Sequence, residues 1–410
     1  MRIALAYSGG LDTSIIIPWL RETRPGSEVV AVCADVGQGD DLAQVRAKAI
    51  ASGAKDAVVL DLRERFVTRH IWPALKLGAV YQHRYLLGTA LARPVIAEGL
   101  ARVAVEVGAD AVAHGATGKG NDQVRFEAAM AALLPDMPVI APWREWSITS
   151  RTEAMAYAES HGVPVDQTPR EPWSRDANLW HISHEGGTLE DVTLAPPAGL
   201  LRMSVSPEAA PDAVVDADIA FTAGVPTALD GMSLAPVSLV ERLNTLAGNA
   251  GVGTVDMVED RLVGVKSRGV YETPGGTVLY SALEALRSVA LDRRARRLLG
   301  DLANSYAELV YDGLYFTPSR QAIEAAGDVL MAPATGHVRL SLYKGNIRIQ
   351  AVEAAKSLYD THVASFDETG SGIEHADASG FMRLYTLPLR TAARAGRTGL
   401  TETAEPSRVG

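Results

Sequence analysis

The sequence predicts an α/β protein: an N-terminal doubly wound parallel sheet, then an α+β region and a C-terminal helix. Short apolar runs alternate with helical stretches through the first third of the chain, as in proteins with parallel sheets. A Ser-Gly-Gly turn follows the first of these runs. From about residue 190 the pattern changes to β-branched runs separated by Gly, Pro and Asp. These three observations favour two different sheets in one chain.

The apolar runs of the first third are short, continuous and partly β-branched, as expected of strands buried on both faces. The predicted strands are 3–7, 29–34, 57–60, 111–113 and 139–141. The predicted helices are 13–24, 41–53, 89–108, 122–134 and 150–161, the last with Ser150 and Glu153 as a capping box. Ligands bind beyond the carboxyl ends of such strands, so the functional residues are expected there.

A proline-rich stretch at 162–173 marks the predicted end of the first domain. The predicted domains are 1–165, 166–360 and 361–410. The second is expected to hold strands at 213–220, 253–258 and 262–266, a helix at 281–299 capped by Ser281 and Glu284, and a hairpin of 338–343 with 345–352.

The composition excludes several classes of protein. With 47% hydrophobic and 21% charged residues, the chain is expected to fold rather than stay disordered. The net charge of −10 opposes non-specific binding of nucleic acid. The single cysteine, Cys33, excludes an intrachain disulfide and a multi-cysteine metal site. The chain has no run of about 18 apolar residues and no signal-peptide pattern, so we expect no membrane partner and a cytoplasmic location.

The segment Ala6-Tyr-Ser-Gly-Gly-Leu-Asp-Thr-Ser14 lies between the first strand and the first helix. Its glycines let the backbone approach an anion, and the helix that opens at Thr13 and Ser14 favours negative charge. A carboxylate beside a phosphate site needs a cation, so Asp12 indicates Mg²⁺. The segment is therefore a predicted phosphate loop.

Neither common nucleotide fingerprint is present. No G-x-G-x-x-G occurs, and Gly115-Ala-Thr-Gly-Lys119 fails as a P-loop because Gly120 stands where Ser or Thr is required. Instead, Ser-Gly-Gly-x-Asp-Thr on the first strand–helix turn resembles the pyrophosphate loop of the N-type ATP pyrophosphatases, which have the adenine nucleotide α-hydrolase fold. That resemblance implies cleavage of ATP between its α- and β-phosphates. Cys33 stands alone in a predicted strand, which opposes a reaction that uses a cysteine as nucleophile. We therefore expect the nucleophile to be an amine that arrives as a free second substrate.

A second motif, His114-Gly-Ala-Thr-Gly-Lys-Gly-Asn-Asp-Gln-Val-Arg-Phe-Glu127, follows the fourth predicted strand. Asn121 and Arg125 are one helical turn apart, so both can face one pocket. Asp122 is suited to an ammonium group and Arg125 to a carboxylate. The motif favours a small charged ligand such as an amino acid.

The chain to about Leu389 resembles the argininosuccinate synthase family. The resemblance rests on AYSGGLDTS at 6–14, YLLGTALARP at 85–94, HGATGKGNDQVRFE at 114–127, PWSRDANLWHIS at 172–183 and KSRGVYETP at 266–274. One departure is Ala90, where some members carry a serine that contacts citrulline, and Thr89 is adjacent to it.

The resemblance implies a ligase of arginine biosynthesis and the urea cycle. It condenses citrulline with aspartate and splits ATP to AMP and pyrophosphate, through a citrulline adenylate and with Mg²⁺. The resemblance implies catalytic roles for Asp12 and Asp122. The implied ATP site comprises Ala6, Tyr7, Ser8, Gly9, Gly10, Leu11, Asp12, Thr13, Ser14, Ala34 and Gly115. The implied aspartate site comprises Thr117, Asn121 and Asp122. The implied citrulline site comprises Tyr85, Asn121, Arg125, Ser174, Ser183, Glu259 and Tyr271.

The family also implies a homotetramer in which the C-terminal segment 361–410 reaches a neighbouring subunit, with residues 166–360 as the synthetase domain. Two alternatives stay open at this point. One is a non-catalytic ATP-binding regulatory protein on the same scaffold, which would have no need of Asp12. The other is a pyrophosphatase-type ligase acting on tRNA, which the acidic charge and the lack of reactive cysteines oppose.

Overall fold

The computed structural model describes residues 1–118, 120–164, 173–365 and 374–397. The chain divides into two compact units, Met1–Ser357 and Leu358–Gly410. The predicted first domain boundary, at 165/166, lies outside the described residues. Among the described residues we find no helix with the length and apolar character that crossing a bilayer requires.

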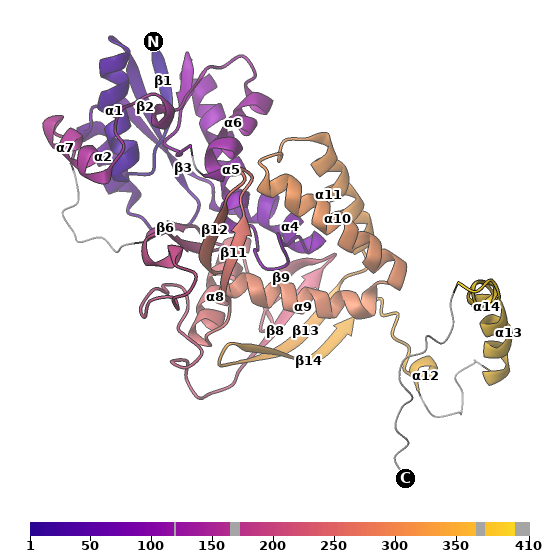
Figure 1. Cartoon of the computed structure of the whole chain (residues 1–410). Coiled ribbons are helices and arrows are strands. Elements are labelled where there is room, and N and C mark those ends of the chain that lie inside the picture. The colour runs from indigo at the N-terminus through magenta and orange to yellow at the C-terminus, as the bar shows by residue number, and fades with distance from the viewer. Residues whose placement is uncertain (119, 165–172, 366–373, 398–410) are drawn as a thin grey trace. The chain divides into compact units, whose positions relative to one another are not determined.

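The first unit begins with a parallel five-stranded sheet in the order β3-β2-β1-β4-β5 (Figure 1). Its strands are β1 (Arg2–Ala6), β2 (Glu28–Asp35), β3 (Asp56–Asp61), β4 (Ala111–Ala113) and β5 (Val139–Ile140). The order reverses between β1 and β4, because β2 and β3 lie on one side of β1 and β4 and β5 on the other. Ligands of doubly wound sheets bind at such a switch point.

Helices cover both faces of this sheet. On one face Ile3 and Leu5 pack in a core with residues of α1 (Leu11–Thr23), α2 (Leu42–Ala51) and α7 (Arg151–Ser160). On the other face Ala4 packs in a core with residues of α5 (Gly88–Glu106) and α6 (Asn121–Leu133). This two-sided cover confirms the predicted doubly wound sheet.

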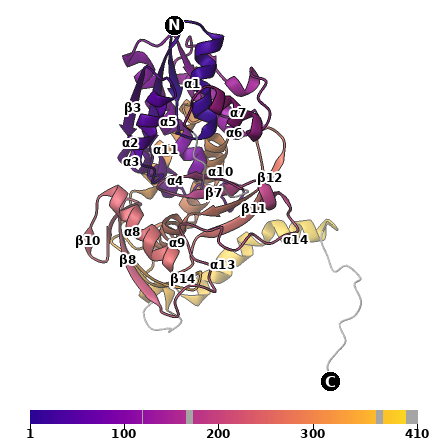
Figure 2. The same cartoon turned by 90° about the vertical axis from the view of Figure 1, so that its left-hand side faces the viewer.

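Two antiparallel sheets complete the first unit. One has the order β11-β12-β7-β6, formed by β6 (Ser174–Ala177), β7 (Ile182–Glu185), β11 (Thr254–Asp260) and β12 (Lys266–Glu272). The other has the order β10-β9-β8-β13-β14, formed by β8 (Val215–Thr222), β9 (Val225–Leu229), β10 (Met232–Ser233), β13 (Gly336–Tyr343) and β14 (Asn346–Ala354). In both ribbon views the sheet of β6, β7, β11 and β12 lies between the parallel sheet and the other antiparallel sheet (Figures 1 and 2).

The remaining helices of the first unit build one large core with the second antiparallel sheet. They are α3 (Arg63–Phe66), α4 (Trp72–Leu77), α8 (Pro236–Asn249), α9 (Pro274–Ala290), α10 (Arg293–Tyr311) and α11 (Pro318–Met331), with a π-helical turn η1 (Val67–Ile71). The first unit also has two short 3₁₀ turns, η2 (Pro142–Arg144) and η3 (Gly187–Glu190). Residues of α4 and α5 share this core with α9 and β13, so the N-terminal and later parts of the first unit are packed together.

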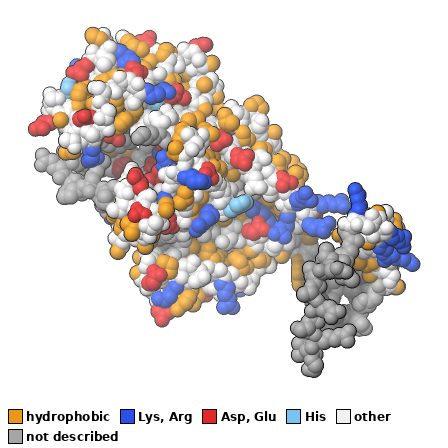
Figure 3. All heavy atoms as spheres, viewed as in Figure 1, with side chains coloured by type: hydrophobic (Ala, Val, Ile, Leu, Met, Phe, Trp, Pro, Cys, Tyr) orange, Lys and Arg blue, Asp and Glu red, His pale blue; other side chains and the backbone are white. Residues whose placement is uncertain are grey.

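The second unit contains α12 (Thr361–Ala364), α13 (His375–Tyr385) and α14 (Leu387–Arg394). Large apolar side chains on α13 are exposed, including Phe381 at 63% and Leu384 at 75%. Figure 3 shows apolar and basic side chains side by side on this unit.

Two predicted elements are wrong. Residues 262–265 are not a strand: the Arg261 N–H donates to the Val265 carbonyl at 2.9 Å and Gly264 has φ of 85°, so this segment turns between β11 and β12, which begins at Lys266. The predicted helix 281–299 is two helices, because the Asp292 side chain accepts from two backbone N–H groups and starts α10. Ser281 and Glu284 lie inside α9 and form no capping box. The predicted hairpin is confirmed, with its turn at Lys344-Gly345.

Candidate active site

The phosphate loop connects β1 to α1 at the switch point of the parallel sheet. Gly9 has φ of 79°, and an added Cβ there would lie 3.1 Å from Val45, so the position favours glycine. Gly10 is the N-cap of α1 and offers no side-chain acceptor to the first N–H groups. These groups and the helix dipole can therefore receive an anion.

Two serines fix the shape of this loop. Ser14, fully buried, donates its hydroxyl to the Gly10 carbonyl at 2.8 Å and contacts the Tyr7 hydroxyl at 2.9 Å. Ser8 accepts from the Gly10 N–H at 3.4 Å and contacts the Thr13 hydroxyl at 3.1 Å. The loop is thus held by its own hydroxyl groups.

A cleft of about 1370 Å³ runs from this loop to the sheet of β6, β7, β11 and β12. It brings together every predicted site residue except Leu11 and Ser14, which are buried beneath the loop. The predicted residues that line it are Ala6, Tyr7, Ser8, Gly9, Gly10, Asp12, Thr13, Ala34, Tyr85, Gly115, Thr117, Asn121, Asp122, Arg125, Ser174, Ser183, Glu259 and Tyr271.

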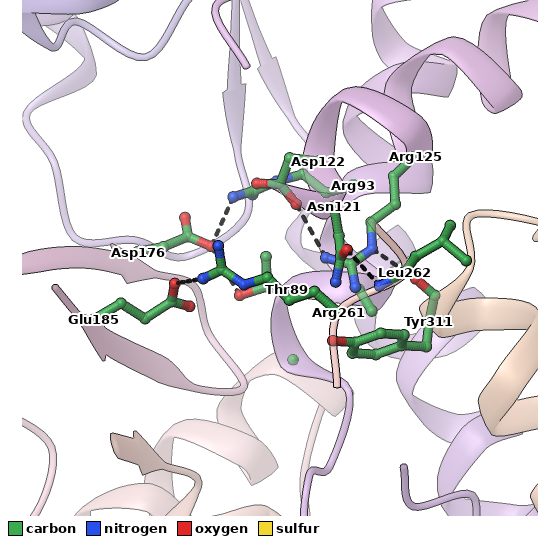
Figure 4. Close-up of polar contacts among 12 residues, drawn as sticks. Thr89, Arg93, Asn121, Asp122, Arg125, Asp176, Glu185, Arg261, Leu262 and Tyr311 are labelled. Carbon is green, nitrogen blue, oxygen red and sulfur yellow. Dashed lines mark hydrogen bonds and ion pairs between the residues drawn. The ribbon is translucent and has the colours of Figure 1, made fainter. Parts of the chain in front are cut away.

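At the start of α6, ionised groups hold one another across the cleft (Figure 4). Arg93 of α5 donates to Asp122 at 2.8 Å and to Asp176 of β6 at 2.7 Å. Asp122 also accepts from Arg125 at 3.0 Å. Burial opposes the ionisation of Asp122, but the charges of Arg93 and Arg125 outweigh it and lower its pKa. Asp122 is therefore a carboxylate fixed between two arginines.

Arg125 is itself fixed from a second direction. Its Nε donates to the carbonyl of Tyr311, at the end of α10, at 3.0 Å, and its guanidinium lies 5.0 Å from the centroid of the Tyr311 ring. Only 5% of Arg125 is exposed. The long α10 thus positions a cation at the edge of the cleft.

The antiparallel sheet presents one face to the cleft because alternate residues of a strand share a face. Ser183 of β7 pairs with Asp176 on one side and with Tyr271 on the other. Two residues along, Glu185 pairs with Ser174 and with Gly269. The serine, tyrosine and carboxylate side chains of three strands therefore meet over one surface.

Two glutamates on this face have raised pKa values. Burial raises the pKa of Glu185 to about 7, although its ion pair with Arg261 opposes the shift. Burial also raises the pKa of Glu259, against the nearby charge of Arg125. The Oε2 atom of Glu259 is buried and has no hydrogen-bond partner among the described residues. A buried, unpartnered carboxylate oxygen calls for a cationic ligand.

The turn between β11 and β12 contacts α6. The Leu262 N–H donates to the side-chain carbonyl of Asn121 at 3.0 Å (Figure 4). The side-chain orientation of Asn121 is thus set by a segment far along the chain.

Sequence reasoning missed several polar residues of the cleft. They include Gln38, Arg93, Asp176, Glu185 and Arg261. A signal for two of them was present, because Asp176 and Glu185 each stand two residues after a predicted serine and so share its face of the strand. No spacing rule links Arg93 or Arg261 to a carboxylate so distant in the sequence.

At the Ala90 position the structure shows why a hydroxyl there would be remote from solvent. Ala90 is fully buried and its N–H donates to the Tyr85 hydroxyl at 3.3 Å. The adjacent Thr89 lines the cleft, donating its hydroxyl to Asp176 at 2.9 Å and contacting His181. The Thr89 hydroxyl is therefore already engaged by two side chains.

Comparison with known proteins identifies the family. The model of the arginosuccinate synthase N-terminal HUP domain matches residues 2–164, and that of the C-terminal domain matches residues 173–392. The argininosuccinate synthase of Carboxydothermus hydrogenoformans is 53% identical over 96% of this chain and 97% of its own length. That of Pelotomaculum thermopropionicum is also 53% identical, over the same shares. The chloroplastic argininosuccinate synthase of Arabidopsis thaliana is 51% identical over 96% of this chain and 79% of its own length. The chain belongs to the argininosuccinate synthase family.

Proposed function

We propose that this chain condenses L-citrulline with L-aspartate and splits ATP to AMP and pyrophosphate, as its family membership implies. The observation that carries the proposal is the single cleft, which joins an anion-binding loop to a surface suited to two amino acids. Neither the described residues nor the comparisons favour the non-catalytic alternative.

The nucleotide is proposed to occupy the end of the cleft formed by β1 and α1. Its phosphates would take the N–H groups of the loop at 8–14, and Ala34 and Gly115 would flank the nucleoside. Mg²⁺ is proposed to bind through Asp12 and phosphate oxygens. The described residues contain no cluster of three or more acidic, histidine or cysteine side chains for a metal, which fits a cation held mainly by a nucleotide.

Citrulline is proposed to lie on the antiparallel sheet. Its ammonium would pair with Glu259, whose Oε2 lacks a partner among the described residues, and its carboxylate with Arg125. The remaining proposed contacts come from Tyr85, Asn121, Ser174, Ser183 and Tyr271. Aspartate is proposed to bind at Thr117, Asn121 and Asp122, with its ammonium on the Asp122 carboxylate that Arg93 and Arg125 keep ionised.

The proposed chemistry needs no covalent intermediate with the protein. The ureido oxygen of citrulline attacks the α-phosphorus, the bond to the β-phosphate breaks, and pyrophosphate leaves. The deprotonated amine of aspartate then attacks the ureido carbon, and AMP leaves with the former ureido oxygen. The chain's contribution is to align the reactants and to neutralise phosphate charge.

A pyrophosphate-release assay tests this proposal by omitting citrulline, aspartate or ATP in turn. We expect sustained release only when all three are present. The Asp12→Asn variant is expected to fold normally and to release pyrophosphate far more slowly, since the amide keeps the shape but not the charge. Release that is independent of citrulline would contradict the proposal.

We further propose a homotetramer, a cytoplasmic location and the domain limits 1–165, 166–360 and 361–410. Family membership supports the first two. The exposed apolar side chains of α13 support an assembly role for the last segment.

A further inference from the structure

The side chain of Gln38 is docked on the main chain just beyond β2. Its Nε2 donates to the carbonyl of Ala34 at 2.9 Å, and its Oε1 accepts from the N–H of Val36 at 2.9 Å. Ala34, Val36 and Gln38 all line the same cleft as the phosphate loop. The single carboxamide of Gln38 is therefore hydrogen-bonded to a backbone acceptor and a backbone donor that lie two residues apart.

These two backbone groups match one edge of adenine. The base presents its 6-amino group as a donor beside N1 as an acceptor, which is the pattern that the Gln38 carboxamide presents. In the proposed function, the Ala34 carbonyl and the Val36 N–H receive this edge of the adenine of ATP. We propose that the Gln38 side chain occupies both backbone groups in the nucleotide-free chain and that the base must displace it. This inference rests on the proposed function, which puts the nucleoside beside Ala34.

The reading groups are held firmly. The Leu179 N–H donates to the Val36 carbonyl at 2.8 Å, and the Gly37 N–H donates to the Asp35 side chain at 2.8 Å. An added Cβ on Gly37, where φ is 82°, would lie 2.6 Å from Leu179, so the backbone is packed closely there. The main chain that carries the two groups can therefore stay in place while a ligand is exchanged.

Gln38, in contrast, has room to leave. It is half-buried, and Gly39 after it is exposed with no atom within 4 Å of an added Cβ. The side chain can leave by rotation about its own bonds, with its carboxamide then hydrated. The exchange replaces two hydrogen bonds of Gln38 by two of adenine. The free energy needed to break the Gln38 bonds therefore lowers the affinity for ATP.

The pairing pattern also sets base specificity. Hypoxanthine presents an acceptor at position 6 and a donor at N1, the reverse of adenine. The 6-oxo acceptor of hypoxanthine would face the Ala34 carbonyl, which is also an acceptor, and its N1 donor would face the Val36 N–H, which is also a donor. Inosine triphosphate therefore gains no hydrogen bond by displacing Gln38, so its phosphates would bind while its base makes no hydrogen bond to Ala34 or Val36.

Binding of Mg²⁺-ATP and Mg²⁺-inosine triphosphate to the full-length chain, by titration calorimetry without citrulline or aspartate, tests this inference. Gln38→Leu keeps the bulk of the side chain without the amide, and Gln38→Ala removes both. The matched control is Gln321→Leu, on the exposed side of α11. We expect both Gln38 variants to bind ATP about three- to tenfold more tightly than the unaltered chain does, as expected if the docked state dominates before binding. We expect no gain for inosine triphosphate and no change in the control.

Unchanged or weaker ATP binding by both Gln38 variants would overturn the inference, as would equal gains for the two nucleotides, because the side chain would then act only by its bulk. These outcomes leave the proposed function intact, since the unaltered chain still binds ATP. Failure of the unaltered chain to bind ATP would overturn both.

Discussion

The charged side chains of the cleft differ in how many opposite charges hold them. Asp122 lies between two arginines, which lower its pKa, whereas Glu185 has Arg261 alone and a raised pKa. Glu259 has a buried oxygen with no partner among the described residues. Before any ligand binds, Asp122 is thus a stabilised carboxylate, whereas burial disfavours the charge of Glu185 and of Glu259.

At the scale of one residue, Arg125→Lys should weaken the use of citrulline far more than that of ATP. Lysine keeps the charge, but a single nitrogen cannot bond the Tyr311 carbonyl, Asp122 and a substrate carboxylate in the way that a guanidinium can. Loss of one charge-assisted hydrogen bond, worth about 1.5–3 kcal/mol, corresponds to a KM for citrulline that is roughly 12- to 140-fold higher. Saturation curves for both substrates measure it, with Arg102→Lys on the exposed side of α5 as control. Equal shifts in the two curves would count against the assignment.

A second residue-scale prediction concerns Glu185. Its pKa is about 7 in the folded chain against an ordinary value of 4.5, so between these values the folded state keeps the proton that the unfolded state has lost. This group's contribution to stability therefore falls as pH rises through that window. Glu185→Gln does not titrate, so its Tm should rise relative to that of the unaltered chain between pH 5 and pH 8.

Thermal melts across this pH range measure the difference, and Glu106→Gln, exposed on α5, is the matched control. A Tm difference for Glu185→Gln that is constant with pH, or that falls as pH rises, would show that burial does not disfavour the charge of this side chain.

At the scale of elements, β7 and β12 have one face on the cleft and another on a buried hydrogen-bonded pair. Ser183 and Tyr271 line the cleft, while their neighbours His184 and Glu272 are fully buried and 2.7 Å apart. The Glu272 carboxylate also accepts from the backbone N–H groups of residues 202–204, at 2.7–2.8 Å. The pair thus fixes the strands that present the proposed citrulline contacts.

Glu272→Ala should therefore lower the free energy of unfolding by about 3–5 kcal/mol, because it leaves the buried His184 ring and the backbone N–H groups of residues 202–204 without their acceptor. Urea unfolding measures the change. Glu353→Ala, a strand glutamate with an exposed side chain on β14, should change stability little. If both variants unfolded at the same urea concentration, the buried pair would have no anchoring role.

The sequence predicted elements well where burial on both sides imposes a continuous pattern. All five strands of the parallel sheet were expected within a few residues, since each is a short apolar run. The missed helices α8 and α11 and the missed start of α9 each have a proline at the first helical position, at Pro236, Pro318 and Pro274 respectively. Proline is favoured there because it has no N–H to lose, so each of these prolines is a sequence signal for a helix start.

The part of the candidate site that lies within one local motif was predictable. Motifs on one strand–helix turn, such as that of Ser8 and Asp12, can be recognised from the spacing of their residues in the sequence. The ion pairs of Arg93 and Arg261 join residues from separate motifs, and the Gln38 contacts depend on how the backbone turns after β2. Such contacts follow from the fold rather than from local pattern.

At the scale of the whole molecule, the second unit is proposed to join subunits. Phe381 and Tyr385 stack on α13 with ring centroids 5.3 Å apart, and both are more than half exposed. Truncation after Tyr359 should therefore lower the number of subunits, because it removes this apolar surface. Light scattering measures it, with a chain ending at Arg397, which keeps α13 and α14, as control. A truncated chain with the full subunit number would refute the role.

The central claim is that ATP activates citrulline before aspartate attacks. Citrulline labelled with ¹⁸O in its ureido group tests it most directly, with the AMP formed by the full-length chain analysed by mass spectrometry. The account predicts that AMP acquires the label, because the ureido oxygen bonds to the α-phosphorus and leaves with it. Unlabelled AMP, formed while argininosuccinate accumulates, would contradict the account.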